Sequence, residues 1–252
     1  MAGDTDVYVT MVGPGATALD DLRGAYRGRT AIVMGSGPSL ARLPANDERI
    51  YRHVLFAVNG AIEYLPRADF FCSSDSGIMD TEWRYTLRES SCRIVQSANR
   101  EQWPLNAVYG IPNSRGIWYT RRTDMRDYDM SPSRPDIILG TSSAHPAVHV
   151  ALVLGCSRVY LVGCDCAYSG SAHHWWQLFG KPASRLLPVQ DRLRFVDPNY
   201  DDIRNIDGHM GAWRVCWQRI KAANPGIPIV DCSGGALKAV FETASIESLV
   251  NT

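Results

Sequence analysis

A glycine- and serine-rich turn is the first stretch that could do chemistry. Residues 35–39 read Gly-Ser-Gly-Pro-Ser and directly follow a short apolar run. Backbone N–H groups in such a turn attract phosphate, and hydroxyls can add hydrogen bonds. No Lys-Ser/Thr follows the glycines, so the turn is not a P-loop, and Leu40 stands where a dinucleotide fingerprint has its third glycine. A plain strand-to-helix turn with Ser39 as the N-cap explains the pattern equally well.

A second stretch, GCDCAYSGSAHHWW at residues 163–176, brings together a carboxylate, a phenol and two imidazoles. Asp165, Tyr168, His173 and His174 could surround a ligand. A solvated loop with aromatic side chains packed beneath it is the alternative. Neighbouring histidines rarely bind the same ion, so we favour a nucleotide over a metal here and assign no metal ligand in our preferred hypothesis.

His209 is the third candidate. It stands between Gly208 and Gly211, and the pattern places it before a helix that carries Trp213 and Trp217. A histidine in this position can cap a helix. It can also act as a general base, because imidazole titrates near neutral pH.

The elements that must position these residues are short apolar strands separated by helical patterns. Several runs are continuously apolar, which is typical of parallel strands covered on both faces. We predict strands at 30–34, 54–58, 70–72, 93–96, 117–119, 136–139, 159–162 and 229–231. Residues 136–165 predict a β-α-β crossover, in which Thr141, Ser142 or Ser143 caps the helix and Gly155 ends it. The fold class is therefore α/β, a Rossmann-like open and mostly parallel sheet with helices on both faces.

Small and polar residues follow five of these strands. They are Gly35-Ser36-Gly37, Asn59-Gly60, Ser73-Ser74-Asp75, Gly140-Thr141-Ser142 and Gly163 with Asp165. Ligands of open parallel sheets bind beyond the carboxyl ends of the strands. We therefore expect these residues to line one polar crevice.

Length and composition exclude several classes of protein. The 252 residues fit one domain, with 180–207 as a lid or acceptor-side insertion. Lys+Arg and Asp+Glu balance at 26 each, which argues against a nucleic-acid partner. The seven cysteines match no zinc spacing and suggest a reducing compartment. No signal peptide or membrane-spanning run is evident, so we expect a cytoplasmic protein.

Taken together, these stretches resemble two related families. The opening GSGPSL, AVNGAI at 57–62, residues 140–169, DGHMGAWRV at 207–215 and IVDCSGGAL at 229–237 resemble bacterial sialyltransferases of glycosyltransferase family 42. They also resemble the MptE-like domain, which includes archaeal 6-hydroxymethylpterin diphosphokinases. The central block, from the Gly-Thr-Ser-Ser turn to Ala167-Tyr168, is the most specific part. The resemblance implies a Rossmann-like domain that binds a nucleotide.

The resemblance also implies a role for each matching residue. Gly35, Ser36 and Gly37 would lie near the nucleotide phosphate. We add Ser39 and Asp75 to the candidate nucleotide-binding residues. Asn59 would contact the nucleotide or sugar, Thr141 and Ser142 would meet a phosphate or carboxylate, and Asp165 would hold a ribose or base edge. Tyr168 and His174 would help the leaving phosphate to depart. His209 matches the general-base histidine of the sialyltransferases.

Three hypotheses follow from these expectations. In the preferred one, the protein is an inverting glycosyltransferase that uses a nucleotide-activated, CMP-linked sugar, a glycan or small-molecule acceptor and no cofactor. His209 favours this glycosyltransferase hypothesis, because MptE-like proteins generally need no histidine at that position. In the second, it is a Mg²⁺-dependent diphosphokinase that uses ATP and a hydroxymethylpterin-like substrate, with Asp75 and Asp165 as metal ligands. In the third, it is a non-catalytic subunit of a larger assembly. A homo-oligomer fits all three.

Overall fold

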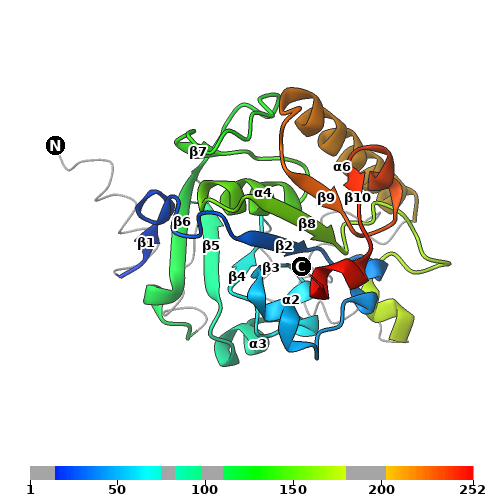
Figure 1. Cartoon of the computed structure of the whole chain (residues 1–252), viewed down its shortest axis with the longest axis horizontal. Helices are drawn as coiled ribbons and strands as arrows, with labels where there is room; N and C mark the ends of the chain where they lie inside the picture. Colours follow the sequence, from blue (N-terminus) through cyan, green and yellow to red (C-terminus); the bar gives the residue numbers. More distant parts are fainter. Residues whose placement is uncertain (1–14, 75–82, 98–109, 180–202, 252) are drawn as a thin grey trace.

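The computed structural model describes residues 15–74, 83–97, 110–179 and 203–251, and for Arg84 and 203–209 it describes the backbone alone. Within these ranges the chain forms one ten-stranded sheet in the order β1-β6-β5-β4-β3-β2-β8-β9-β10, with β7 paired to β6 (Figure 1). All the neighbouring strands are parallel. The strands are β1 (Thr17–Ala18), β2 (Thr30–Met34), β3 (Val54–Val58), β4 (Phe70–Cys72), β5 (Arg93–Ser97), β6 (Gly116–Arg121), β7 (Asp136–Ile137), β8 (Arg158–Val162), β9 (Ile229–Asp231) and β10 (Glu242–Thr243).

Helices cover both faces of the sheet. One face packs against α4 (Ala144–Val153) and α6 (Ile203–Ala223), and the opposite face packs against α2 (Ala61–Tyr64) and α3 (Trp83–Glu89) (Figure 1). Short 3₁₀ helices complete the layers: η1 (Leu19–Leu22), η2 (Pro38–Arg42), η3 (Glu48–Arg52), η6 (Asn113–Arg115), η7 (Trp175–Phe179), η9 (Ala236–Ala239) and η10 (Ile246–Val250). The predicted α/β class is therefore confirmed.

The central strands show why their sequences are continuously apolar. In β2, Ala31 and Val33 face the α4 side, whereas Ile32 and Met34 face the α2 side. Side chains alternate between the two faces along a strand, so in a strand buried on both faces every position favours an apolar residue. Each of these four side chains is fully buried.

The strand order reverses at β2. From β2 the chain builds β3, β4, β5 and β6 on one side, and β8 then returns to pair with the other side of β2. The helix that makes this return, α4, is buried along its whole length. Gly155 follows it with a φ of 93°, a left-handed conformation that favours glycine after a helix. Ligand sites of open α/β sheets lie at such a reversal.

Two sequence predictions about local structure need correction. Ser143, one of the three predicted caps, is the N-cap residue of α4, but its side chain makes no capping hydrogen bond. His209 does not precede a helix, because α6 begins at Ile203 and contains it. A glycine costs a helix only about 1 kcal/mol. Burial of Trp217 and its neighbours later in α6 offsets that cost.

The charged segment between β6 and β7 packs around one buried arginine. The guanidinium of Arg122 donates to the carbonyl oxygens of Asp127 and Asp129 at 3.1 and 2.8 Å, and to a carboxylate oxygen of Asp136 at 2.9 Å. Arg134 joins the same network through Asp127 at 2.9 Å. These contacts fix the segment to the sheet.

No helix in the described part of the chain is long and apolar enough to cross a membrane. The proposed insertion at 180–207 lies mostly outside the described residues, which end at residue 179 and resume at Ile203.

Candidate functional site

The loops that leave β2, β3, β4 and β8 converge at one edge of the sheet. Ser36 Oγ donates to the carbonyl oxygen of Val58 at the end of β3, at 3.2 Å. The amide of Asn59 donates to the carbonyl oxygen of Cys72 at the end of β4, at 3.3 Å. The amide of Ser74 donates to Ser143 Oγ at 2.8 Å, which joins this edge to the start of α4.

The loops after β2 and β8 pack tightly against each other. The amide of Gly37 donates to the carbonyl oxygen of Gly163 at 2.7 Å. A Cβ added to Gly35 would overlap that same carbonyl, and one added to Gly37 would overlap the carboxylate of Asp165. Both glycines of the GSGPS turn are therefore required by loop packing, whatever else they do.

Asp165 holds the turn after β2 through Ser39. Its carboxylate accepts hydrogen bonds from Ser39 Oγ at 3.0 Å and from the Ser39 amide at 3.3 Å. Ser39 Oγ in turn accepts from the amide of Gly163 at 2.8 Å. Gly37, not Ser39, is the N-cap residue of η2. Burial raises the pKa of Asp165 to about 6, although the Ser39 hydrogen bonds act in the opposite direction.

A second carboxylate at this edge was not singled out by the sequence patterns. Asp231 ends β9 and is 1% exposed. Its Oδ1 accepts from the amide of Ser233 at 2.9 Å, whereas its Oδ2 is buried and without a partner among the described residues. Burial raises the pKa of Asp231, and its charge adds to the rise in the pKa of Asp165.

The start of α4 wraps around His145, a second feature that sequence patterns did not identify. Its Nδ1 lies within hydrogen-bond distance of the amides of Thr141 and Ser142, at 3.2 and 3.0 Å. The ring is fully buried and packs on Trp217, with centroids 4.3 Å apart. Burial lowers the pKa of His145 to about 3, so the ring is neutral. Two amides that we expected to face an anion are thus already directed at an imidazole.

The aromatic segment after β8 is largely a packing element. Trp175 and Trp176 are buried, and Trp176 lies against Gly60 so closely that a Cβ there would overlap its ring. His174 stacks on Trp176 with centroids 4.2 Å apart, and its Nδ1 lies 3.3 Å from the carbonyl oxygen of Ser36. Burial lowers the pKa of His174 to about 3, with His173 adding to the effect.

Tyr168 lies beside the same aromatic segment. Its ring meets the half-buried ring of His173 edge-on, with centroids 6.0 Å apart. Two predicted residues fall outside this picture: Asp75 lies outside the described residues, and only the backbone of His209 is described. Their roles stay predictions.

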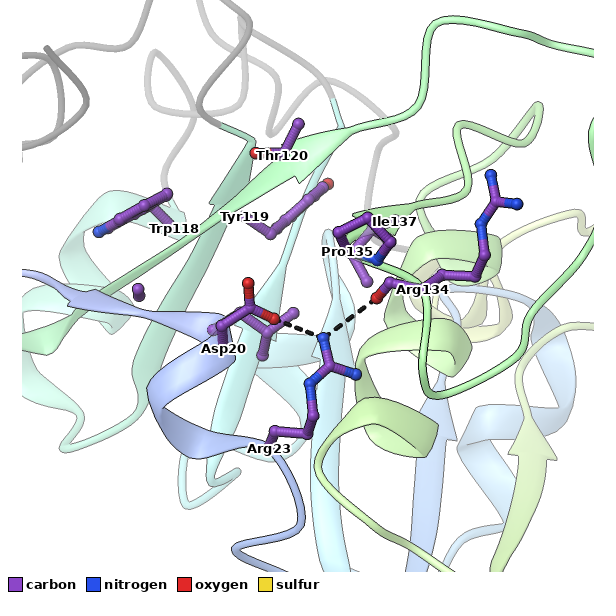
Figure 2. Close-up of a pocket in the computed structure, with 10 residues that line it drawn as sticks. Asp20, Arg23, Trp118, Tyr119, Thr120, Arg134, Pro135 and Ile137 are labelled. Carbon is purple, nitrogen blue, oxygen red and sulfur yellow. Dashed lines mark hydrogen bonds and ion pairs between the residues drawn. The ribbon is translucent and has the colours of Figure 1, made fainter. Parts of the chain in front are cut away.

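A small pocket lies elsewhere, at the β1–β6 end of the sheet (Figure 2). Arg23 and Arg134 line it together with Trp118, and a guanidinium N–H of Arg23 donates to the carbonyl oxygen of Arg134 at 3.1 Å. β3, β4 and β5 separate this pocket from β2. None of the residues predicted from the sequence to bind a ligand lines it.

Comparison with known families decides the relationship. The sequence model for 6-hydroxymethylpterin diphosphokinase MptE-like proteins matches residues 11–171, more than half of the chain. The chain belongs to the MptE-like family. The match runs from before β1 through the turn after β8 and includes Asp165 and Tyr168, whereas His174, α6 and β9 follow it. No curated protein matches the chain.

Membership in the MptE-like family corrects our preference between the two enzyme hypotheses. The link to the sialyltransferases is not supported by the match, which names the diphosphokinase branch of the resemblance. His209 was the residue that favoured glycosyl transfer, and its side chain is not among those described. The diphosphokinase hypothesis, placed second from the sequence, is therefore the better supported.

Proposed function

We propose that the protein transfers a diphosphate group from ATP to the hydroxymethyl group of a small heterocycle of the hydroxymethylpterin type. The substrate oxygen attacks the β-phosphorus of ATP, and the bond between that phosphorus and the α-phosphate oxygen breaks. AMP leaves, and the proton of the hydroxyl is released. The observation that carries this assignment is the family match across residues 11–171, which contains the whole strand reversal between β2 and β8.

The chemistry implies Mg²⁺, which neutralises the phosphate charge of ATP. The donor set at the edge fits such an ion. Asp165 and Asp231 are buried carboxylates at the ends of neighbouring strands, and Asp231 Oδ2 has no partner among the described residues. That part of the chain contains no group of three His, Cys, Asp or Glu side chains arranged for a metal. Mg²⁺ does not need three protein ligands, because one or two carboxylates and the substrate phosphates commonly hold it. Asp165 and Asp231 would then hold the ion, with Asp75 as a third candidate.

The protein's own residues would orient the reactants and keep water away from them. The Ser36 and Ser142 hydroxyls lie at the convergent edge and can contribute hydrogen bonds to phosphate oxygens. The Asn59 backbone has a φ of 52°, a conformation uncommon outside glycine, at the turn after β3. Strained residues of this kind gather at ligand sites. Asn59 would therefore be a contact to the nucleotide.

AMP formation from ATP tests this function directly. With 6-hydroxymethylpterin, its dihydro form and Mg²⁺, the wild-type protein is expected to release one AMP for each diphosphorylated product. EDTA should stop the reaction. Asp165→Asn is expected to lose most of the activity, whereas Asp124→Asn, an exposed carboxylate in the segment between β6 and β7, should retain it. Release of CMP from a CMP-linked sugar without Mg²⁺, and no AMP from ATP, would refute the assignment.

A further inference from the structure

The imidazole of His174 is held in one orientation by the GSGPS turn. The carbonyl oxygen of Ser36 lies 3.3 Å from Nδ1 and also accepts the amide of Trp175 at 3.0 Å. A carbonyl oxygen can only accept a hydrogen bond, so Nδ1 must carry the proton. The other ring nitrogen, Nε2, is then left with a lone pair and acts as an acceptor.

The surroundings of the ring keep it neutral. Trp176 covers one face, with an interplanar angle of 19°, and His173 packs at a tilt with its centroid 4.5 Å away. No Asp, Glu, Lys or Arg side chain of the described chain shifts the pKa of His174, which responds to burial, to His173 and to the Ser36 carbonyl oxygen. Burial and His173 both disfavour the imidazolium form. At neutral pH, His174 therefore cannot donate a proton to a leaving phosphate, the role that we first expected.

The remaining edge of the ring is available to a ligand. The side chain of His174 is partly exposed, and Nε2 has no hydrogen-bond partner among the described residues. The amides of His173 and His174 both donate to Gln177 Oε1, at 2.8 and 2.9 Å, which fixes the backbone that carries the ring. A rigid acceptor beside the Ser36 turn selects for a ligand group with an N–H or O–H donor and against a phosphate oxygen.

We infer that His174 is a specificity-determining residue, a neutral acceptor that binds a donor group of the nucleoside part of the nucleotide, such as a ribose hydroxyl or an exocyclic amine. This role rests on the proposed function, since it requires that a nucleotide binds at the strand reversal. Different groups of the protein then bind the two parts of the nucleotide: His174 binds the nucleoside, and other groups of the edge bind the phosphates.

Two isosteric substitutions test this role. The side-chain nitrogen of His174→Asn can replace Nδ1 and keep the bond to Ser36 but offers nothing at the Nε2 position. The amide oxygen of His174→Gln can replace the Nε2 acceptor. Binding of adenosine, AMP and inorganic pyrophosphate is measured by calorimetry. We expect His174→Asn to weaken adenosine and AMP by about three- to tenfold, the loss of one neutral hydrogen bond. His174→Gln should stay within about twofold, and pyrophosphate binding should be unchanged in both.

A measurement on the wild-type protein tests the same role without depending on whether the variants fold. Long-range ¹H–¹⁵N correlation spectra are expected to show His174 protonated at Nδ1 and unprotonated at Nε2, with no titration between pH 8 and 5. The opposite tautomer, a pKa near 6.5, or equal losses in the two variants would overturn the role of His174 while leaving the proposed function intact. Failure of the wild type to bind adenosine, AMP or pyrophosphate would overturn both.

Discussion

Two fully buried histidines, His145 and His149, and the mostly buried His174 make the stability of the fold strongly dependent on pH. His145 and His174 have pKa values of about 3, and His149 has one of about 4, in each case mainly because burial disfavours the charged ring. In the unfolded chain a histidine titrates near pH 6.5. Below that pH the unfolded state binds more protons than the native state, so acidification must destabilise the fold.

The size of the effect follows from these values. Between pH 7 and 5, each histidine lowers the free energy of unfolding by about 2 kcal/mol, because one pKa unit corresponds to about 1.4 kcal/mol. Asp165 acts in the opposite direction. Its native pKa of about 6 lies above its unfolded value, so it favours the native state by about 1.3 kcal/mol more at pH 5 than at pH 7. The net loss is about 4 kcal/mol, a large part of a typical domain's total stability.

Urea unfolding at 25 °C and fixed ionic strength, measured at half-unit steps from pH 7.5 to 5, checks this prediction. The free energy of unfolding should fall by about 4 kcal/mol, with uptake of about two protons on unfolding at pH 5. His149→Asn should flatten the curve, because the amide oxygen can still accept from the Ile138 amide, which now donates to Nδ1 at 3.1 Å. A stability that changes by less than about 1 kcal/mol over this range would refute the neutral, buried state of these rings.

The remaining predictions concern one ion-pair network and one close contact. Replacing Arg122 with alanine leaves Asp127 and Asp136 without their buried partner. It should lower the free energy of unfolding by about 3–5 kcal/mol in urea titrations, whereas Arg126→Ala, at an exposed position, should change it by less than about 0.5 kcal/mol. A loss of similar size in both variants would contradict the central place of Arg122. Gly37→Ala should push the loops after β2 and β8 apart, lowering both the melting temperature and the affinity for ATP. Gly226→Ala, where an added methyl meets no atom within 4 Å, should leave both unchanged, and a silent Gly37→Ala would show that the two loops do not need their close contact.

The strands were predictable because buried strands have short runs of apolar residues in the sequence. β2, β3, β4 and β9 begin and end at the predicted residues, because each has a short apolar core that is bounded by small or polar residues. The two-residue strands β1 and β10 escaped prediction because two residues carry no periodic pattern. The convergence of Ser36, Asn59 and Asp165 was also predictable, because parallel strands place their carboxyl ends at one edge.

The roles of individual polar residues could not be predicted in the same way. His145 looked like an ordinary helix residue, and only the fold shows that the amides of Thr141 and Ser142 point at its ring. The glycines of the GSGPS turn suggested contact with a ligand, yet the fold shows that the loop after β8 already requires them. The demand on these glycines comes from Gly163 and Asp165, more than one hundred residues away, so the local sequence carries no trace of it.

Binding of ATP at the strand reversal is the central claim, and backbone NMR with added ATP and Mg²⁺ tests it most directly. The amides of Ser36, Asn59 and Ser142 are expected to shift together along one binding curve, and those of Trp118 and Thr120 in the pocket of Figure 2 are expected to stay in place. Shifts confined to Trp118 and Thr120, or no shifts at saturating ATP, would contradict it.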